Sequence, residues 1–305
     1  MIQTYRTLRV TGGEEGVLSV VIDAPPMNLI GPELVRDLVT LLSDLDADAN
    51  IRVMVLESAD PEYFVPHVDL TKVAEYTAEA AKAGGPDDAS LGMLWHKLSQ
   101  LPVVTIAKLR GRARAAGSEL ALACDMRFAA RENAILGQPE VGFGTLPGAG
   151  GMQHLGRLLG RGRAMEAILG AADFDAVEAE RYGWINRALP DAELDGFVAG
   201  LARRIASFPA EAVRTAKQVL NELTLPGADA IRADSRRFHQ LVGSDTVQAR
   251  TAALFAQGLQ TRSPLELDLG DRIGSVLQKE KSRGHGTTSD WITRHDRQPG
   301  SSAGR

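Results

Sequence analysis

The sequence contains a single cysteine, Cys124, among its 305 residues, which excludes an internal disulfide and any metal site built from several cysteines. Neither sign of charge dominates, because 34 Lys and Arg stand against 39 Asp and Glu, for a formal net charge of −5. This balance provides no global field that would favour nucleic acid or an anionic membrane as a partner. No apolar run approaches the roughly 18 residues that a membrane span requires.

The start of the chain also lacks the pattern of a targeting signal. Residues 1–6 have no apolar core of the kind found in signal peptides, so we expect a cytoplasmic protein. What the chain does contain is 44% hydrophobic residues, enough for a well-buried core in one or two domains. We therefore expect a globular protein.

Strand and helix signals alternate along most of the chain. Apolar, β-branched runs predict strands at 16–23, 51–57, 102–109, 126–130 and 134–136. Helical spacing of apolar residues predicts helices at 31–45, 70–82, 91–101, 151–170 and 209–223, and mostly helix over 229–260. Asp175 and Glu178 form a capping-box pattern for a short helix that Gly183 ends. This alternation is typical of an α/β fold.

Two glutamates lie beside Gly-containing turns after the apolar strand at 102–109. Glu119 follows Ala-Ala-Gly-Ser, and Glu140 ends the sequence Gly-Gln-Pro-Glu, shortly before Gly-Ala-Gly-Gly at 148–151. The strand would deliver Glu119 at its carboxyl end, where α/β enzymes place their sites. Two carboxylates in such turns suggest paired acid and base chemistry.

These segments, in this order, resemble the enoyl-CoA hydratase/isomerase (crotonase) superfamily, and the resemblance is strongest over 102–160. It implies an α/β, crotonase-like spiral of repeated ββα units with a helical C-terminal module. We expect a spiral core with the active site at 1–200 and a helical module at 201–277, which would cover the acyl pocket and support oligomerisation. The polar segment 278–305 carries too few apolar residues to order itself, and we expect a disordered basic tail there.

The resemblance implies an acyl-CoA thioester substrate, whose oxygen gains negative charge during the reaction. Two backbone N–H groups would stabilise that charge, those of Val68 and Ala116. The Ala116 amide stands at a helix N-terminus, where unpaired amides and the dipole favour an anion. Val68 lies in a loop where His67 replaces the glycine of the family. A lone loop histidine is more often a hydrogen-bonded structural residue than a catalytic one.

Glu119 and Glu140 match the two catalytic glutamates of the hydratases. One would activate water for addition to the β-carbon, and the other would deliver the α-proton, so that trans-2-enoyl-CoA becomes 3-hydroxyacyl-CoA. Burial and mutual repulsion should raise the pKa of one carboxyl while the other stays ionised. Gly148 matches a backbone donor that helps to hold the water.

Further residues are expected near the substrate from their place in the family's loops or from their charge. They are Met27, Leu29, Val65, His67, Asp69 and Arg112. Asp69 could instead cap the following helix, and Arg112, on one face of an extended segment with Arg114, could either meet phosphate or pair with surface acids. No lysine near 256–258 matches the family's late Lys-Arg pair, so the ligand of the CoA phosphates stays open.

Two alternatives to hydration remain. Glu140 alone could serve as the base of a double-bond isomerase or another crotonase reaction, or the chain could be a non-catalytic CoA-binding or assembly subunit. We expect no metal and no cofactor apart from the coenzyme A of the substrate. The family relation implies a role in fatty-acid metabolism and a homotrimer or a dimer of trimers, without nucleic-acid or membrane partners.

Overall fold

The computed structural model describes residues 4–13, 15–84, 88 and 90–275. The segment 278–305, for which the sequence predicts a disordered tail, lies outside these residues. None of the helices in the described part of the chain is both long and apolar enough to span a membrane.

The strands form two sheets, and from β3 to β8 successive strands alternate between them. The large sheet contains, in spatial order, β1 (Leu8–Gly12), β2 (Val17–Ile22), β3 (Val53–Ser58), β5 (Val104–Leu109), β7 (Met126–Ala130) and β10 (Arg187–Leu189). The small sheet contains β4 (Tyr63–Val65), β6 (Arg112–Arg114), β8 (Ile135–Gly137) and β9 (Asp173–Asp175). All neighbouring strands are parallel except the pairs β1 with β2 and β8 with β9.

This order confirms the predicted spiral of ββα units. In the pairs β3 and β4, β5 and β6, and β7 and β8, the first strand joins the large sheet and the second joins the small sheet. Each pair is followed by helix. The helices that follow are α2 (Val73–Gly84) with α3 (Leu91–Gln100), then α4 (Ala116–Ala123), then α5 (Glu140–Phe143).

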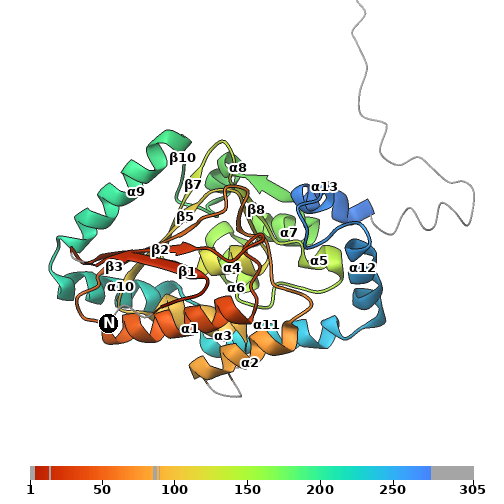
Figure 1. The fold of residues 1–305 in the computed structure, drawn as a ribbon, viewed down its shortest axis with the longest axis horizontal. Coiled ribbons are helices and arrows are strands. Elements are labelled where there is room, and N and C mark those ends of the chain that lie inside the picture. The colour runs from red at the N-terminus through yellow and green to blue at the C-terminus, as the bar shows by residue number, and fades with distance from the viewer. Residues whose placement is uncertain (1–3, 14, 85–87, 89, 276–305) are drawn as a thin grey trace, which may run out of the picture.

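The middle strands of the large sheet, β3, β5 and β7, are buried on both faces, as their apolar sequences predict. In β3, Met54 and Leu56 pack into the cluster that holds the inner faces of α1 (Pro32–Ala47), α3 and α4. Val53 and Val55 point the other way, against α9 (Asp191–Ala206). Figure 1 shows α9 on one side of the strands and α1, α2 and α3 on the other. This alternation follows from the two-residue period of a strand.

Glycines divide two of the predicted helices. The segment 151–170 forms α6 (Gly151–Leu159) and α7 (Arg161–Gly170), because Gly160 adopts a φ of 73° that ends the first helix. The segment 229–260 forms α11 (Ala228–Val242) and α12 (Asp245–Phe255), with Ser244 capping the second. The predicted cap at Asp175 is present, since its side chain accepts from the Glu178 amide at the start of α8 (Ala176–Tyr182).

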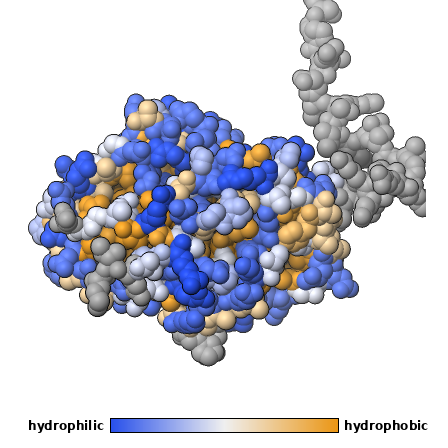
Figure 2. All heavy atoms as spheres, viewed as in Figure 1, coloured by the Kyte–Doolittle hydropathy of each residue, from blue (hydrophilic) through white to orange (hydrophobic). Residues whose placement is uncertain are grey.

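The C-terminal module packs along two sides of the spiral. The expected boundary at residue 200 falls inside α9, whose Val198, Ala202 and Ala206 pack in one cluster, and we use the name C-terminal module for the part of the chain that follows this helix. It contains α10 (Ala210–Thr224), α11, α12, α13 (Pro264–Leu267), α14 (Leu269–Arg272) and a short 3₁₀ turn (Ile273–Ser275). On the face shown in Figure 2, hydrophobic side chains emerge near the large sheet and near α12 within a mainly hydrophilic surface.

Candidate active site

One cavity brings together the residues for which the sequence predicts catalysis. It has a volume of about 380 Å³, and its walls include Glu119, Glu140, Val68, Ala116 and Gly148. The C-terminal helices α11 and α12 close the cavity on one side. Most of the remaining lining is apolar and includes Leu70, Val73, Leu91, Phe143, Phe238 and Val242.

Glu119 reaches the cavity through a tight connection between β6 and α4. Ala115 adopts φ 47° and ψ −129°, which turns the chain sharply, and Ala116 begins the helix. Gly117 then lies against β4 so closely that a Cβ would stand 2.0 Å from the Val65 carbonyl oxygen. Glu119 follows the carboxyl end of the strand at 102–109 in the chain, with the short strand β6 of the small sheet between that strand and α4.

Two backbone amides hold the Glu119 carboxylate. Glu119 is 2% exposed, and its Oε1 accepts from the amides of Ala149 and Gly151, each at 2.8 Å. These amides come from the Gly-Ala-Gly-Gly turn that opens α6. Gly148 lines the cavity, and its carbonyl accepts a hydrogen bond of 2.7 Å from Ser235 Oγ on α11. The turn therefore fixes the carboxylate itself, a role that the sequence did not reveal.

Glu140 has a different partner. It begins α5 and is 7% exposed, and in the amide orientation that satisfies both groups the Gln138 nitrogen donates to its two carboxyl oxygens at 3.0 Å each. Gln138 belongs to the Gly-Gln-Pro-Glu sequence but received no role in the sequence analysis. Thr145 also lines the cavity, and its buried hydroxyl lacks a hydrogen-bond partner among the described residues. A water or substrate atom could satisfy it.

Burial raises the pKa values of both carboxyls above the usual value of a glutamate. It raises the pKa of Glu119 to about 7, although the amides of Gly151 and Ala149 favour the ionised form and act against this rise. Burial and the charge of Glu119 raise the pKa of Glu140 well above its usual value. Both pKa values are thus raised. The sequence predicted a raised pKa for only one carboxyl, with the other ionised. The two backbone amides favour the ionised form of Glu119, whereas the charge of Glu119 favours the protonated form of Glu140.

The Ala116 and Val68 amides both border the cavity. The Ala116 amide, as the first of α4, has no acceptor within its own helix. Val68 pairs with Ile30 in a parallel bridge, in which the Ile30 amide donates to the His67 carbonyl and the Asp69 amide donates to the Ile30 carbonyl. Because these bonds use the groups on either side of Val68, its own amide faces away from Ile30.

His67 lines the cavity but is held within the protein. It is 5% exposed, with Nδ1 2.8 Å from the Val68 carbonyl and Nε2 3.0 Å from Glu266 Oε1. Both ring nitrogens therefore have an oxygen partner within the protein. These contacts fit the structural interpretation of this histidine.

Other residues expected near the substrate lie elsewhere. Met27 and Val65 are fully buried outside the cavity, and Leu29 is half-buried and is also absent from its described walls. Asp69 Oδ1 instead accepts from the amide and hydroxyl of Thr71, at 2.9 and 2.6 Å, in the turn before α2. These four residues are thus absent from the described walls of the cavity, and their assignment to substrate binding stays a prediction.

The arginines of β6 also have partners within the chain. Arg112 Nε donates to the Leu267 carbonyl at 2.8 Å in the C-terminal module, and its expected contact with the substrate stays a prediction. Arg114 is fully buried and pairs with Asp173 at 2.5 Å. The extended segment does place both arginines toward one part of the molecule, but that part is α13 and β9.

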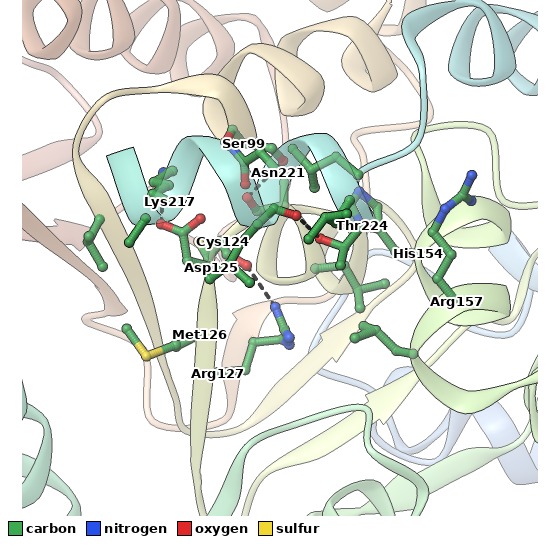
Figure 3. A pocket seen from close by; sticks show the side chains of 18 of the residues that line it. Ser99, Cys124, Asp125, Met126, Arg127, His154, Arg157, Lys217, Asn221 and Thr224 are labelled. Atoms are coloured by element: carbon green, nitrogen blue, oxygen red, sulfur yellow. Dashed lines mark hydrogen bonds and ion pairs between the residues drawn. The ribbon is translucent and has the colours of Figure 1, made fainter. Parts of the chain in front are cut away.

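A second and larger cavity, of about 790 Å³, lies between α10 and the end of α4 (Figure 3). Its charged groups are engaged: Lys217 pairs with Asp125 at 2.8 Å, and buried Arg127 donates to the Cys124 carbonyl at 2.7 Å. Cys124 itself is buried. The described walls of this cavity include none of the predicted catalytic residues, so its size does not make it the better candidate.

Comparison with known proteins finds a matching family and similar proteins over most of the chain. Residues 12–261 match the enoyl-CoA hydratase/isomerase family. A "probable enoyl-CoA hydratase" of Mycobacterium leprae is 30% identical, over 85% of this chain and 97% of that protein. The short-chain-enoyl-CoA hydratase of Clostridium acetobutylicum is 34% identical, over 68% and 79%. A crystal structure of a "putative enoyl-CoA hydratase" from Streptomyces avermitilis is 64% identical, with a TM-score of 0.88 over 90% of this chain and 98% of that one.

Proposed function

The chain belongs to the enoyl-CoA hydratase/isomerase family, and we propose that it hydrates trans-2-enoyl-CoA to 3-hydroxyacyl-CoA. One observation carries this proposal: two buried glutamates, Glu119 and Glu140, line the same cavity with unlike partners. Two amides favour the ionised form of Glu119, whereas burial and the neighbouring charge favour the protonated form of Glu140. A base and an acid side by side are what the addition of water requires.

In the proposed reaction Glu119 takes a proton from water while the water oxygen bonds to C3 of the enoyl group. The electrons of the double bond move toward the thioester, whose oxygen becomes negative. Glu140 then delivers its proton to C2, and return of one proton from Glu119 to Glu140 restores the pair. The atoms balance, because the product gains one hydrogen at C2 and one hydroxyl at C3.

The amides of Val68 and Ala116 would stabilise the negative thioester oxygen. Their location on the cavity wall supports this role, as does the α4 N-terminus, whose dipole favours an anion. One well-placed donor of this type contributes roughly 10²–10³ in rate. The apolar walls contributed by Leu70, Phe143 and Val242 would surround the acyl chain.

A double-bond isomerase is the main alternative, and it would need only Glu140. The buried and doubly hydrogen-bonded Glu119 favours hydration, because a carboxylate without a catalytic role is seldom buried in a cavity without a cationic partner. A CoA-binding or assembly subunit would show no turnover of any acyl-CoA.

Separate Glu119→Gln and Glu140→Gln variants test the proposal. Each should lower the hydration rate of a short trans-2-enoyl-CoA by roughly 10²–10⁴-fold while binding of a saturated acyl-CoA persists, because only proton transfer is lost. If Glu119→Gln keeps wild-type turnover while Glu140→Gln is inactive, isomerisation replaces hydration as the proposed reaction. Absence of all turnover in the wild-type protein would favour the binding subunit.

We also propose that the protein forms a homotrimer or a dimer of trimers. The support is a set of exposed apolar side chains that line the second cavity together: Leu158 on α6, and Leu220 and Leu223 on α10. Leu223 is 76% exposed. Contiguous apolar surface of this kind marks protein contacts more often than free surface.

A further inference from the structure

Two hydrogen bonds converge on the carbonyl oxygen of Val68, the residue whose amide faces the proposed oxyanion hole. His67 Nδ1 lies 2.8 Å from this oxygen, and Gln260 Nε2 donates to it at 2.9 Å. The next amide, that of Asp69, donates to the Ile30 carbonyl at 3.0 Å. The peptide group after Val68 is therefore fixed at both ends, and the peptide before it is fixed by the bond from Ile30 to the His67 carbonyl.

Glu266 joins the two donors to each other. Its Oε1 lies 3.0 Å from His67 Nε2, and its Oε2 accepts from the backbone N–H of Gln260 at 2.8 Å. The Glu266 side chain has no exposed surface, and its two oxygens have hydrogen-bond partners within the chain. Burial alone would raise its pKa, but His67, the Gln260 amide and Arg114 together lower the pKa below its usual value. A buried carboxylate so stabilised forms a rigid link between these residues.

The segment around Glu266 also contacts the chain next to Ala116, the other proposed oxyanion donor. We name residues 260–267 the C-terminal strap. Arg114 donates to the Glu266 carbonyl at 2.7 Å and to the Leu267 carbonyl at 2.9 Å, and it stands two residues before Ala116. The strap thus contacts the segments that carry both proposed oxyanion donors, one through His67 and Gln260 and the other through Arg114.

We infer that Glu266 and Gln260 are positioning residues, which hold the Val68 amide at the angle needed to bind the thioester oxygen. This inference rests on the proposed function of the site. It accounts for the histidine at position 67, because the imidazole forms the contact through which Glu266 acts on the loop. Neither strap residue touches the substrate in this role.

A saturated acyl-CoA provides a test that does not depend on turnover. Hexanoyl-CoA labelled with ¹³C at the thioester carbonyl cannot be hydrated, and isotope-edited infrared spectroscopy reports how strongly the bound carbonyl is polarised. The variants are Gln260→Met, which keeps the length of the side chain but removes the donor, and Glu266→Gln, which keeps the shape but removes the charge. Arg262→Gln is the matched control, because Arg262 anchors the same strap through Asp60, Glu62 and Pro26 without contacting Val68.

We expect Gln260→Met and Glu266→Gln to reduce the carbonyl shift on binding and to lower kcat by about 10- to 100-fold with little change in KM, since small misplacement of a donor costs rate. Arg262→Gln should keep both the shift and kcat. A wild-type shift in Gln260→Met, in protein with the wild-type melting temperature, overturns the inference even if Glu266→Gln fails to fold.

The two proposals fail in different ways. If wild-type protein hydrates enoyl-CoA but neither variant changes the carbonyl shift, the strap inference is wrong and the proposed function stands. If wild-type protein polarises the bound carbonyl in a strap-dependent way but never hydrates an enoyl-CoA, the positioning role stands and the proposed reaction is wrong.

Discussion

Ser235 Oγ donates a hydrogen bond of 2.7 Å to the carbonyl of Gly148, and the amide of the same peptide group, on Ala149, donates to Glu119. One peptide thus connects α11 of the C-terminal module to a proposed catalytic carboxylate. A donor on the carbonyl of a peptide strengthens the hydrogen bond that its N–H makes, because the two bonds polarise each other. Ser235 is therefore expected to favour the ionised form of Glu119.

Replacing Ser235 by alanine should weaken this support. The Ala149 amide would then stabilise the Glu119 carboxylate less, so the acid limb of the pH profile of kcat/KM should move to higher pH, and the rate below pH 7 should fall. Ser244→Ala is the control, because Ser244 caps α12 in the same module without touching the turn. It should cost about 1 kcal/mol of stability and leave the acid limb in place. An unchanged acid limb in Ser235→Ala would contradict the prediction.

The pH dependence of activity should have two limbs. Glu119 acts as the base in its ionised form, so kcat/KM should rise as pH increases through about 7. Glu140 acts as the acid in its protonated form, so activity should fall at a higher pH, because the pKa of Glu140 is raised well above its usual value. The two limbs belong to the pair and are measured as a bell-shaped profile. A profile flat between pH 5 and 9 would refute the assignment.

The free energy of unfolding should fall as pH rises toward 7, whereas kcat/KM should rise over the same interval. A carboxyl whose pKa is raised on folding stabilises the protein while it is protonated, and this stabilisation is lost as pH rises through the folded pKa. For Glu119 the rise from 4.5 to about 7 corresponds to a loss on the order of 3 kcal/mol across that interval. Glu119→Gln should therefore melt at a higher temperature than wild type at pH 8, and a lower melting temperature there would count against burial of an ionised Glu119.

Much of the fold was predictable because its signals are local. Short stretches of sequence contain the apolar runs of β3 and β5, the capping box at Asp175 and the two glutamate turns in their order. The two glutamates met in one cavity because the predicted spiral brings successive turns together. The arginines of β6 and the donors to Glu119 were not predictable, since their partners depend on which loop folds over which.

The contact between His67 and Glu266 shows this limit most clearly, because 199 positions separate the two residues. In the sequence, His67 reads as a departure from the family pattern, and nothing nearby explains it. The compensating groups, Glu266 and Gln260, lie in a polar stretch with no motif of its own. Only the folded chain places them together.

The apolar face of α10 gives a test of assembly. Leu220 and Leu223 are 59% and 76% exposed, so replacing both by glutamate should leave the folded subunit intact. It should disrupt an oligomer, because two charges would then be buried at the contact without partners. Light scattering coupled to size exclusion should show a trimeric or hexameric wild type and a smaller variant. A monomeric wild type would contradict the proposed oligomer.

Gly151 provides the sharpest test of how Glu119 is held. A Cβ at this position would lie 3.0 Å from Glu119 Oε1 and 2.9 Å from the Gln138 amide, so Gly151→Ala must displace the carboxylate or its neighbour.

Gly156, on the same helix, has nothing within 4 Å of its Cβ position. Gly156→Ala should therefore keep full activity and gain about 0.5–1 kcal/mol of stability, the usual advantage of alanine over glycine within a helix. Gly151→Ala should lose roughly tenfold to a hundredfold in kcat while acyl-CoA binding persists, since a shift of about 1 Å in a catalytic group has an effect of this size. Equal kcat values for the two variants would show that the turn at 148–151 does not position the base, and Glu119 would then have to act through other contacts.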